Sequence, residues 1–416
     1  METIGIVAEY NPFHNGHLYM LQEAKKLTGA KNVVVVMSGD FVQRGAPAWT
    51  DKYLRTKLAL AAGVDMVFEL PVCYATASAE PFAAAGVNLL HSLGFVEGIC
   101  FGSEYGKLEE LNQAAEYLAT PPASFDRQIK ELTAAGASYP TARMMALPEQ
   151  WQKLVSFPNT TLGIEYLKEI KRLKSPLIPI VIKRTAAGHH DTALSGTIAS
   201  ATAIRAAYSS PGKGELPENM LASLPESSAG LLKENWKHFP VTTDDFSLLM
   251  YYRLSQVTQK ESRDILDMTP ELYNRIQNLL PEYDTLSSFT EKLKTRQFTY
   301  SRISRVLLHC LLGIKKEDIR QNFPLVPYAR LLGFRKEKSG LLREVEKIPV
   351  ITKPSNGFAL LDTFYDQADT GRQLSAYGKT LLKKDFAAAN IYRQVQRDKL
   401  GISFLPEECQ KPVIFP

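Results

Sequence analysis

The protein is poor in cysteine and has no long apolar run. Its 416 residues include only four cysteines, and these form no CxxC pair: Cys73, Cys100, Cys310 and Cys409. This spacing excludes the disulfide framework of a small secreted fold and a structural zinc site, so we expect reduced thiols. No stretch approaches the ~18 apolar residues of a transmembrane helix. The N-terminus also lacks the features of a signal peptide, and together these absences predict a cytoplasmic protein without a membrane partner.

An excess of charge of one sign is confined to the second half of the chain. Lys and Arg number 49 and Asp and Glu 44, a formal net charge of +5. Residues 1–210 carry 19 of each sign, whereas residues 291–350 carry 14 basic and 6 acidic side chains. Such a surplus is a candidate binding surface for a polyanion, because phosphate binding replaces condensed counterions. An ordinary solvated helical face explains it equally well.

The first half alternates apolar runs with helical patterns. The runs lie at residues 3–8, 32–37, 64–70, 95–101 and 177–183, and helical patterns at 16–28, 51–62, 79–93 and 106–118. Short β-branched runs that alternate with helices predict a Rossmann-like, doubly wound parallel sheet, an α/β domain over residues 1–210. Residues 120–157 are rich in proline and have weaker periodicity, so we expect a helical excursion there.

The second half begins at a Ser/Pro/Gly cluster near residue 212, which is typical of a linker. The patterns after it predict a mainly helical domain over residues 213–416. Apolar residues at helical spacing predict a helix over 301–312, capped by Gly313, with Arg302, Arg305 and His309 on its polar side. A capping-box pattern, Ser288 to Glu291, predicts a second helix that bears Lys292, Lys294 and Arg296. The basic surplus should therefore lie largely on helix faces.

An H-x-G-H pattern directly follows the first predicted strand. His14 and His17 lie three residues apart, where the first helix is expected to begin, so both imidazoles can reach one anion above its N-terminus. Gly16 allows a nucleotide to approach the backbone closely. Imidazoles and a helix dipole suit charge that develops on an α-phosphate as pyrophosphate leaves. Two ordinary histidines remain the alternative.

A second element, from Ala199 to Arg205, predicts a helix start after the last strand. The hydroxyls of Ser200 and Thr202 and the guanidinium of Arg205 suit β- and γ-phosphates. The plain structural alternative is that such a helix start is only a cap, as it usually is.

Four single residues are further candidates, each with a plain structural alternative. Asp40 could orient an acyl group or a metal-bound water, or be a turn aspartate. Gly102 would let a base or ribose lie directly on the backbone, or be a plain turn glycine. Arg184 could pair with a phosphate, or be an ordinary surface arginine. Asn159 resembles an N-cap after Pro158. A histidine pair followed by aspartate at residues 189–191 has no third ligand at a recognisable spacing, so we expect no protein-held metal.

Together these residues resemble the nucleotidyltransferase superfamily with the HxGH signature, whose late S-S-T-x-I-R pattern binds the triphosphate; Ala201 replaces its second serine here. Longer strings resemble the bacterial tRNA(Met) cytidine acetate ligase family over essentially the whole chain. They are GIVAEYNPFHNGH at 5–17, MSGDFVQRG at 37–45, FPNTTLGIEYL at 157–167 and YARLLGF at 328–334. The resemblance implies that ATP and acetate form acetyl-adenylate, and that the wobble cytidine of elongator tRNA(Met) is acetylated to N4-acetylcytidine.

The resemblance, with the residues above, assigns the site. His14, His17 and Asp40 are the expected catalytic residues. The expected ATP-binding residues are Val7, Ala8, Glu9, Tyr10, Asn11, Pro12, Phe13, His14, Asn15, Gly16, His17, Leu18, Tyr19, Met20, Gly102, Asn159, Arg184, Ser200, Thr202 and Arg205. The expected tRNA-binding residues are Lys292, Lys294, Arg296, Arg302 and Arg305.

We expect Mg²⁺ to arrive with ATP, since it needs few protein ligands, and acetate to be the co-substrate. No obligate protein partner is predicted. Two other functions fit the first half alone: a nucleotidyltransferase that moves AMP or CMP onto a phosphorylated metabolite, and an RNA-binding module regulated by a nucleotide. The basic helical half argues against the first, and the intact histidine pair argues against the second.

Overall fold

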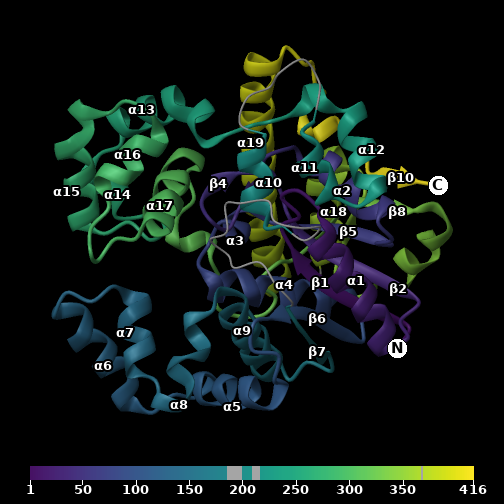
Figure 1. The fold of residues 1–416 in the computed structure, drawn as a ribbon, viewed down its shortest axis with the longest axis horizontal. Coiled ribbons are helices and arrows are strands. Elements are labelled where there is room, and N and C mark those ends of the chain that lie inside the picture. The colour runs from purple at the N-terminus through teal and green to yellow at the C-terminus, as the bar shows by residue number, and fades with distance from the viewer. Residues whose placement is uncertain (185–198, 209–215, 367–368) are drawn as a thin grey trace.

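A computed structural model describes residues 1–184, 199–208, 216–366 and 369–416, and its centre is one mixed β-sheet (Figure 1). The strand order is β10-β8-β5-β2-β1-β6-β7, with β9 paired to β8; β3 and β4 form a separate hairpin. The strands are β1 (Thr3–Ala8), β2 (Asn32–Ser38), β3 (Phe41–Val42), β4 (Ala46–Pro47), β5 (Met66–Leu70), β6 (Gly98–Ser103), β7 (Ile178–Lys183), β8 (Ala329–Arg335), β9 (Val350–Ile351) and β10 (Val413–Phe415).

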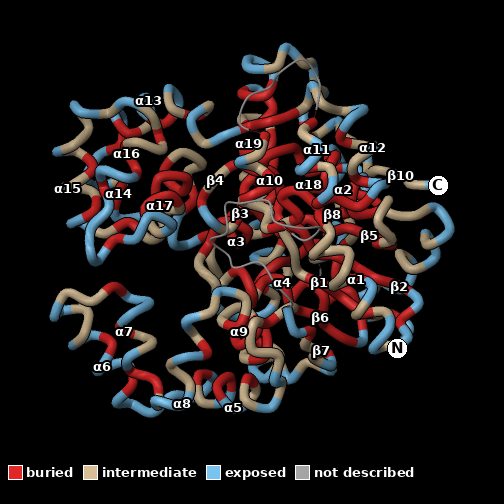
Figure 2. Tube along the Cα trace, viewed as in Figure 1, coloured by how far each residue is buried: buried red, intermediate tan, exposed pale blue. Residues whose placement is uncertain are grey.

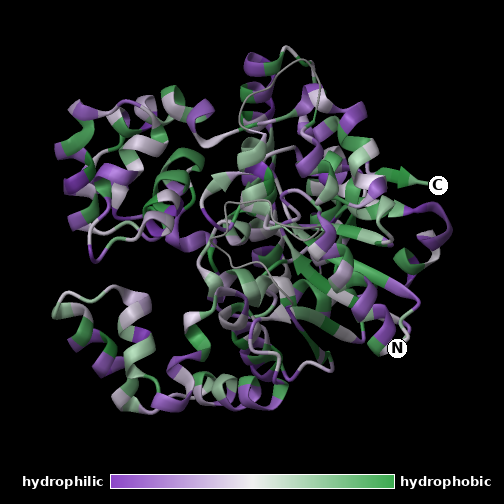
Figure 3. Cartoon of the chain, viewed as in Figure 1, coloured by the Kyte–Doolittle hydropathy of each residue, from purple (hydrophilic) through white to green (hydrophobic). Residues whose placement is uncertain are grey.

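The sheet is buried on both faces, as its β-branched runs predict. Val34 and Val36 of β2 belong to the apolar core on one face, whereas Val33 and Val35 belong to the core on the other. Successive side chains of a strand point to opposite faces, so an unbroken valine run fits this position. Figure 2 shows buried residues concentrated along the strands, and Figure 3 shows that these are also the most hydrophobic segments.

The five strands predicted in the first half are present and run parallel to one another. This confirms the Rossmann-like α/β class. The sheet also extends further than expected, because β8 adds antiparallel to β5, and β9 and β10 pair with β8. The second half is therefore mostly helical, as predicted, but contributes three strands, so the complete sheet is mixed rather than purely parallel. The division into domains 1–210 and 213–416 stays a prediction.

Helices cover both faces of the sheet. One face carries α1, α2 and α10 to α12, and the other carries α4, α5, α9 and the long α19. The helices of the first half and its continuation are α1 (Asn15–Thr28), α2 (Lys52–Ala61), α3 (Val72–Ala75), α4 (Ala79–Leu93), α5 (Leu108–Ala119), α6 (Ala123–Ala134), α7 (Tyr139–Ala146), α8 (Glu149–Gln152), α9 (Pro158–Leu173), α10 (Ala201–Ala207), α11 (Glu218–Ala222) and α12 (Glu226–Glu234).

Residues 243–318 form a separate cluster of helices, called here the helical unit, beside the sheet (Figure 1). The remaining helices are α13 (Ser247–Gln256), α14 (Gln259–Ser262), α15 (Pro270–Leu279), α16 (Leu286–Leu293), α17 (Tyr300–Leu312), α18 (Gly357–Tyr365) and α19 (Asp369–Leu400). The predicted excursion over 120–157 is confirmed as α6 to α8. Gly313 ends α17, also as predicted, and Asp51 is the N-cap of α2.

Two local predictions are wrong. The N-cap of α16 is Thr285, which precedes the predicted Ser288, and the helix ends before Lys294 and Arg296. His309 was expected on the polar side of α17 but is fully buried. Its ring nitrogens lie 3.0 Å from the carbonyl of Thr76 and 3.2 Å from that of Leu266, so it joins the helical unit to the sheet domain.

All four cysteines are free thiols, and three of them are buried, in agreement with the prediction. Among the described residues, no helix combines the length and the apolar composition that crossing a membrane requires.

Candidate active site

A cavity of about 600 Å³ opens at the carboxyl ends of the parallel strands β1, β6 and β7. Ligands of open α/β sheets bind at this edge. The described residues that line it are Ile6, Val7, Ala8, Glu9, Tyr10, Asn11, His14, His17, Met20, Val42, Gln43, Arg44, Ala46, Pro47, Trp49, Phe82, Phe101, Gly102, Pro158, Asn159, Leu162, Tyr166, Arg184, Ser200, Ala201, Thr202, Arg205, Tyr208, Pro240, Val241, Thr242 and Thr243.

His14 and His17 form a stacked pair at the start of α1. Their ring centroids are 3.7 Å apart with an interplanar angle of 25°. His14 is the N-cap: its Nδ1 accepts a hydrogen bond of 3.0 Å from the Gly16 amide, and Nδ1 of His17 accepts one of 3.3 Å from the His14 amide. The two imidazoles therefore replace the Ser and Glu of an ordinary capping box. Both histidines line the cavity, as predicted.

Both histidines are neutral at physiological pH. Burial lowers the pKa of His14 to about 3, and the nearby Arg184 and Arg205 contribute to that shift. Burial, His14 and Arg184 hold the pKa of His17 well below its usual value. Because Nδ1 of each ring accepts a backbone hydrogen bond, a neutral ring carries its proton on Nε2. The pair thus offers Nε2–H donors without adding charge to the cavity.

Arg205 joins the late helix α10 to the loop after β1. Its guanidinium donates to the carbonyl of Asn11 at 2.7 Å and to the hydroxyl of Thr202 at 3.2 Å. Ser200 caps α10, since its hydroxyl accepts from the amide of Ala203 at 3.1 Å. The two predicted sequence elements therefore meet in one cavity, although nearly 200 residues separate them along the chain.

Gly102, Asn159 and Arg184 form the side of the cavity near β6 and β7. A Cβ atom on Gly102 would lie 3.1 Å from Cγ of Arg184, so the absence of a side chain lets the arginine stem pack there. Asn159 is not the N-cap that the sequence suggested, because Phe157 holds that position. Its side-chain amide instead donates to Glu104 at 2.6 Å, and Glu104 also accepts from the backbone and hydroxyl of Thr160.

Asp40 does not line the cavity. It is buried, its Oδ1 accepts from the Lys52 amide at 2.8 Å, and burial raises its pKa to about 6. Its carbonyl also accepts from the amide of Ala48, which closes the loop containing β3 and β4. Asp40 is absent from the described lining residues, and its catalytic role stays a prediction. Six residues of the predicted stretch at 7–20 also lie outside the lining: Pro12, Phe13, Asn15, Gly16, Leu18 and Tyr19.

Sequence reasoning missed a whole side of the cavity. The β3–β4 hairpin contributes Val42, Gln43, Arg44, Ala46 and Pro47, followed by Trp49, and Tyr208 and the segment 240–243 complete this side. The hairpin strands have two residues each, too short for any periodicity to reveal. The string MSGDFVQRG was the available signal, since it carries Gln43 and Arg44 directly after β2.

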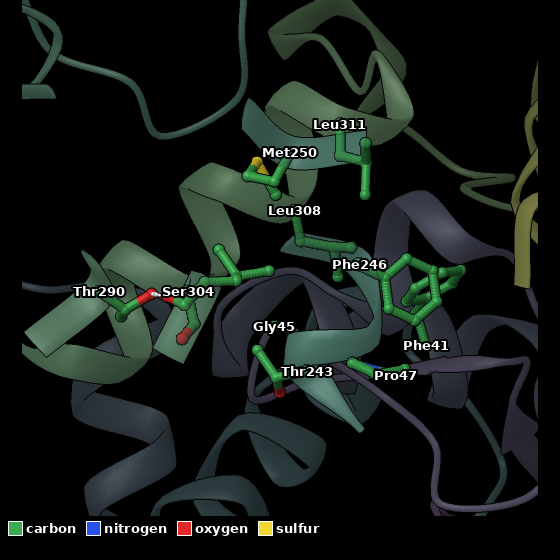
Figure 4. Close-up of a pocket in the computed structure, with 11 residues that line it drawn as sticks. Phe41, Gly45, Pro47, Thr243, Phe246, Met250, Thr290, Ser304, Leu308 and Leu311 are labelled. Carbon is green, nitrogen blue, oxygen red and sulfur yellow. Dashed lines mark hydrogen bonds between the residues drawn. The ribbon is translucent and has the colours of Figure 1, made fainter. Parts of the chain in front are cut away.

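The hairpin also touches the helical unit. A small second cavity of about 10 Å³ separates Phe41, Gly45 and Pro47 from apolar side chains of α13 and α17 (Figure 4). A Cβ atom on Gly45 would lie 2.3 Å from the amide nitrogen of Arg305. The hairpin thus has the candidate active site on one side and α17 on the other.

The five predicted tRNA-binding residues lie on or beside α16 and α17, but their surroundings differ. Lys292 and Lys294 form ion pairs with Glu282 and Glu291, and the guanidinium of Arg302 lies 5.0 Å from the ring centroid of Phe298. Arg296 is exposed. Arg305 is half-buried against the hairpin, so it is the least accessible of the five to a large ligand.

Among the described residues, no cluster of three or more His, Cys, Asp or Glu side chains could hold a metal ion. The histidine pair and aspartate at residues 189–191 lie outside the described residues. Glu9 is the single carboxylate among the described lining residues, and its Oε1 accepts from the Gln43 amide at 2.9 Å. One carboxylate together with phosphate oxygens is a usual way to hold Mg²⁺, so the donor set fits an ion that comes with a nucleotide.

The fold and the histidine pair define a nucleotidyltransferase, and the comparison with known families agrees: residues 1–402 match the model described as "HIGH Nucleotidyl Transferase". The tRNA(Met) cytidine acetate ligase of Acetivibrio thermocellus is 38% identical over 86% of this chain and 89% of its own length. That of Thermosipho melanesiensis is 37% identical over 100% of this chain and 99% of its own.

Solved structures agree with the sequence relatives. Thermotoga maritima TmcAL without a ligand superposes with a TM-score of 0.90 at 31% identity, and the same protein bound to alpha-thio ATP with a TM-score of 0.87 at 29% identity; both cover 100% of both chains. The chain therefore belongs to the HIGH nucleotidyl transferase family and, within it, to the tRNA(Met) cytidine acetate ligase family. The family resemblance seen in the sequence is confirmed.

Proposed function

We propose that this protein is an ATP-dependent ligase that acetylates the wobble cytidine of elongator tRNA(Met) to N4-acetylcytidine, with acetate as the acyl donor. The observation that carries the proposal is the stacked His14–His17 pair joined through Asn11 to Arg205 in one cavity of about 600 Å³. The relatives' names supply the acceptor, and a relative bound to alpha-thio ATP supplies the nucleotide. With ATP and tRNA as substrates, the reaction belongs in the cytoplasm.

In the first step an acetate oxygen attacks the α-phosphorus of ATP, the bond to the β-phosphate breaks, and pyrophosphate leaves. The Nε2–H groups of His14 and His17 would donate to the α-phosphate as its charge grows. Ser200, Thr202 and Arg205 would hold the departing pyrophosphate. Glu9 and the phosphates would together hold a Mg²⁺ ion that neutralises part of the phosphate charge. Neutral imidazoles suit the donor role, because they donate without first breaking a strong ion pair.

In the second step the exocyclic amine of cytidine attacks the acetyl carbonyl, AMP leaves, and the amine loses a proton. The wobble base must be unstacked and placed in the cavity, as enzymes that act on a base generally require. The anticodon loop is single-stranded, so this costs little. The helical unit would hold the rest of the tRNA through Lys292, Lys294, Arg296 and Arg302, with Arg305 nearer the cavity.

The test incubates the purified protein with ATP, Mg²⁺ and radiolabelled acetate, with and without bulk bacterial tRNA, followed by nucleoside analysis. We expect ATP-dependent label in N4-acetylcytidine, and loss of the label in His17→Ala. His91→Ala is the matched control, because His91 is half-buried but lies outside the cavity lining. Transfer of AMP or CMP to a small metabolite, with no label in tRNA, would replace the proposal with a small-molecule nucleotidyltransferase. Tight RNA binding without any turnover would replace it with a binding module.

A further inference from the structure

Arg44 adds a third arginine to the candidate active site. The described lining residues include Arg44, Arg184 and Arg205 but a single carboxylate, Glu9. The three arginines come from three segments: the β3–β4 hairpin, the end of β7 and helix α10. Burial lowers the pKa of Arg205, and the positive charge of Arg44 lowers it further. The surplus of cations predicts that anionic oxygens occupy the side of the cavity that the hairpin forms.

The hairpin holds Arg44 at the tip of a tight turn. The amide of Gly45 donates to the carbonyl of Val42 at 2.9 Å, so Gln43 and Arg44 occupy the central positions of the turn. The Gln43 amide donates to Glu9 Oε1 at 2.9 Å, which ties the turn to the end of β1. The turn therefore has a defined place relative to the loop that carries the histidine pair.

Helix α17 supports the turn from the other side. Gly45 has a φ angle of +75°, and a Cβ atom there would lie 2.3 Å from the Arg305 amide nitrogen and 2.5 Å from the Ser304 carbonyl carbon. These are backbone atoms, so a side chain at residue 45 could be accommodated only if the hairpin and α17 moved apart. Figure 4 shows Gly45 and Pro47 facing the side chains of the helical unit. The close approach makes the position of Arg44 depend on α17.

We propose that Arg44 contacts the anionic oxygens of the substrates in the acetate-activating reaction, and that the contact between Gly45 and α17 positions it. This inference rests on the proposed function. The hairpin follows β2, whereas Arg184 ends β7, and β1 with its histidine pair lies between these strands in the sheet. The attacking carboxylate and the departing pyrophosphate lie on opposite sides of the α-phosphorus, so anionic oxygens are present on both sides. The two sources of such oxygens for Arg44 are the acetate carboxylate and the triphosphate.

The experiment measures acetate-dependent ATP–pyrophosphate exchange without tRNA, together with the Kd for ATP by calorimetry. We expect Arg44→Gln to lower kcat/KM for acetate at least about tenfold. Arg44→Lys should keep part of the activity, because lysine keeps the positive charge but lacks the paired N–H donors of a guanidinium. A rise in KM for acetate with an unchanged Kd for ATP identifies the carboxylate as the partner of Arg44. A matching rise in the Kd for ATP identifies the triphosphate. Unchanged exchange and unchanged ATP affinity in Arg44→Gln would overturn the proposal.

The positioning role is tested with Gly45→Ala. We expect it to change the same kinetic constant as Arg44→Gln, in the same direction, and to add little when the two are combined. Gly29→Ala is the matched control: Gly29 also has a positive φ, +66°, but nothing lies within 4 Å of its Cβ position. Equal decreases in the Gly29 and Gly45 variants would show general strain and remove the positioning role. Where Gly45→Ala does not fold, Arg44→Gln and Arg44→Lys still decide the contact itself.

The assay also separates this inference from the proposed function. A wild-type protein that shows no acetate-dependent exchange contradicts the proposed function. If the wild type shows acetate-dependent exchange and Arg44→Gln shows the same rate, only the role of Arg44 is contradicted.

Discussion

The guanidinium of Arg205 donates a 2.7 Å hydrogen bond to the carbonyl oxygen of Asn11. This bond connects helix α10 to the loop that carries the histidine pair. Asn11 accepts a second hydrogen bond, because its side-chain oxygen accepts from the Trp49 amide at 2.7 Å. Asn11 therefore connects α10, the loop with the histidine pair and the hairpin side of the cavity.

We predict that Arg205→Lys lowers the rate of acetate-dependent ATP–pyrophosphate exchange by about 100-fold. Lysine keeps the charge but cannot donate to both Asn11 and Thr202 while binding a phosphate, and removal of one preorganised donor costs about this much. The measurement is kcat/KM for ATP in the exchange assay. Arg127→Lys, at an exposed position on α6, is the control and should behave as wild type. A change of less than about threefold would contradict the assignment.

The buried side chain of His14 makes the stability of the protein depend on pH. The folded pKa of His14, about 3, lies below the unfolded value of about 6.5, so only the unfolded chain takes up its proton as the pH falls below 6.5. Stability therefore decreases on acidification, by about 2 kcal/mol at pH 5 from this group. His14→Asn keeps a side chain that can cap the helix but does not titrate in this range. Urea unfolding at pH 7 and pH 5 should therefore show a smaller loss of unfolding free energy in His14→Asn than in the wild type, by about 2 kcal/mol. Parallel decreases in both proteins would contradict this prediction.

Glu407, near the C-terminus, is a buried anion on which three cations converge. It is fully buried, with Lys52 at 2.8 Å, Arg393 at 3.3 Å and Arg330 also paired to it. These partners lower its pKa to about 2, although burial alone would raise it. We predict that Glu407→Gln lowers the free energy of unfolding by about 3–5 kcal/mol, because buried cations are left uncompensated. In the same urea titration, exposed Glu346→Gln should change it by less than about 0.5 kcal/mol.

The helical unit should carry the salt-dependent part of tRNA binding. Reversing Lys292, Lys294 and Arg296 to Glu is expected to weaken binding and to reduce the slope of log K against log salt by about 0.7–0.9 for each phosphate that is no longer neutralised. The control reverses three exposed lysines elsewhere: Lys26, Lys57 and Lys347. Filter binding over a series of salt concentrations gives both slopes. Equal slopes for the two triple variants would place the tRNA on another surface.

The sequence alone was enough for the α/β class, the five parallel strands and the two helix starts, at His14 and Ser200, that line the cavity. The valine run of β2 and the helical spacing after His14 are local patterns, and local patterns follow from backbone geometry and burial. The family strings extended this to a specific activity. Each of these features depends on residues that are close together in the sequence.

The tertiary structure decided what depends on residues far apart in the chain. Strands β8 and β10 join the sheet by pairing with distant partners, which no periodicity predicts. Asp40 is absent from the cavity lining, and its carboxylate and carbonyl accept from the amides of Lys52 and Ala48. Arg44 and Gly45 have their place only because α17 lies against the hairpin. Contacts of this kind form when the chain buries its apolar faces together, so they are set by packing and are invisible in local sequence.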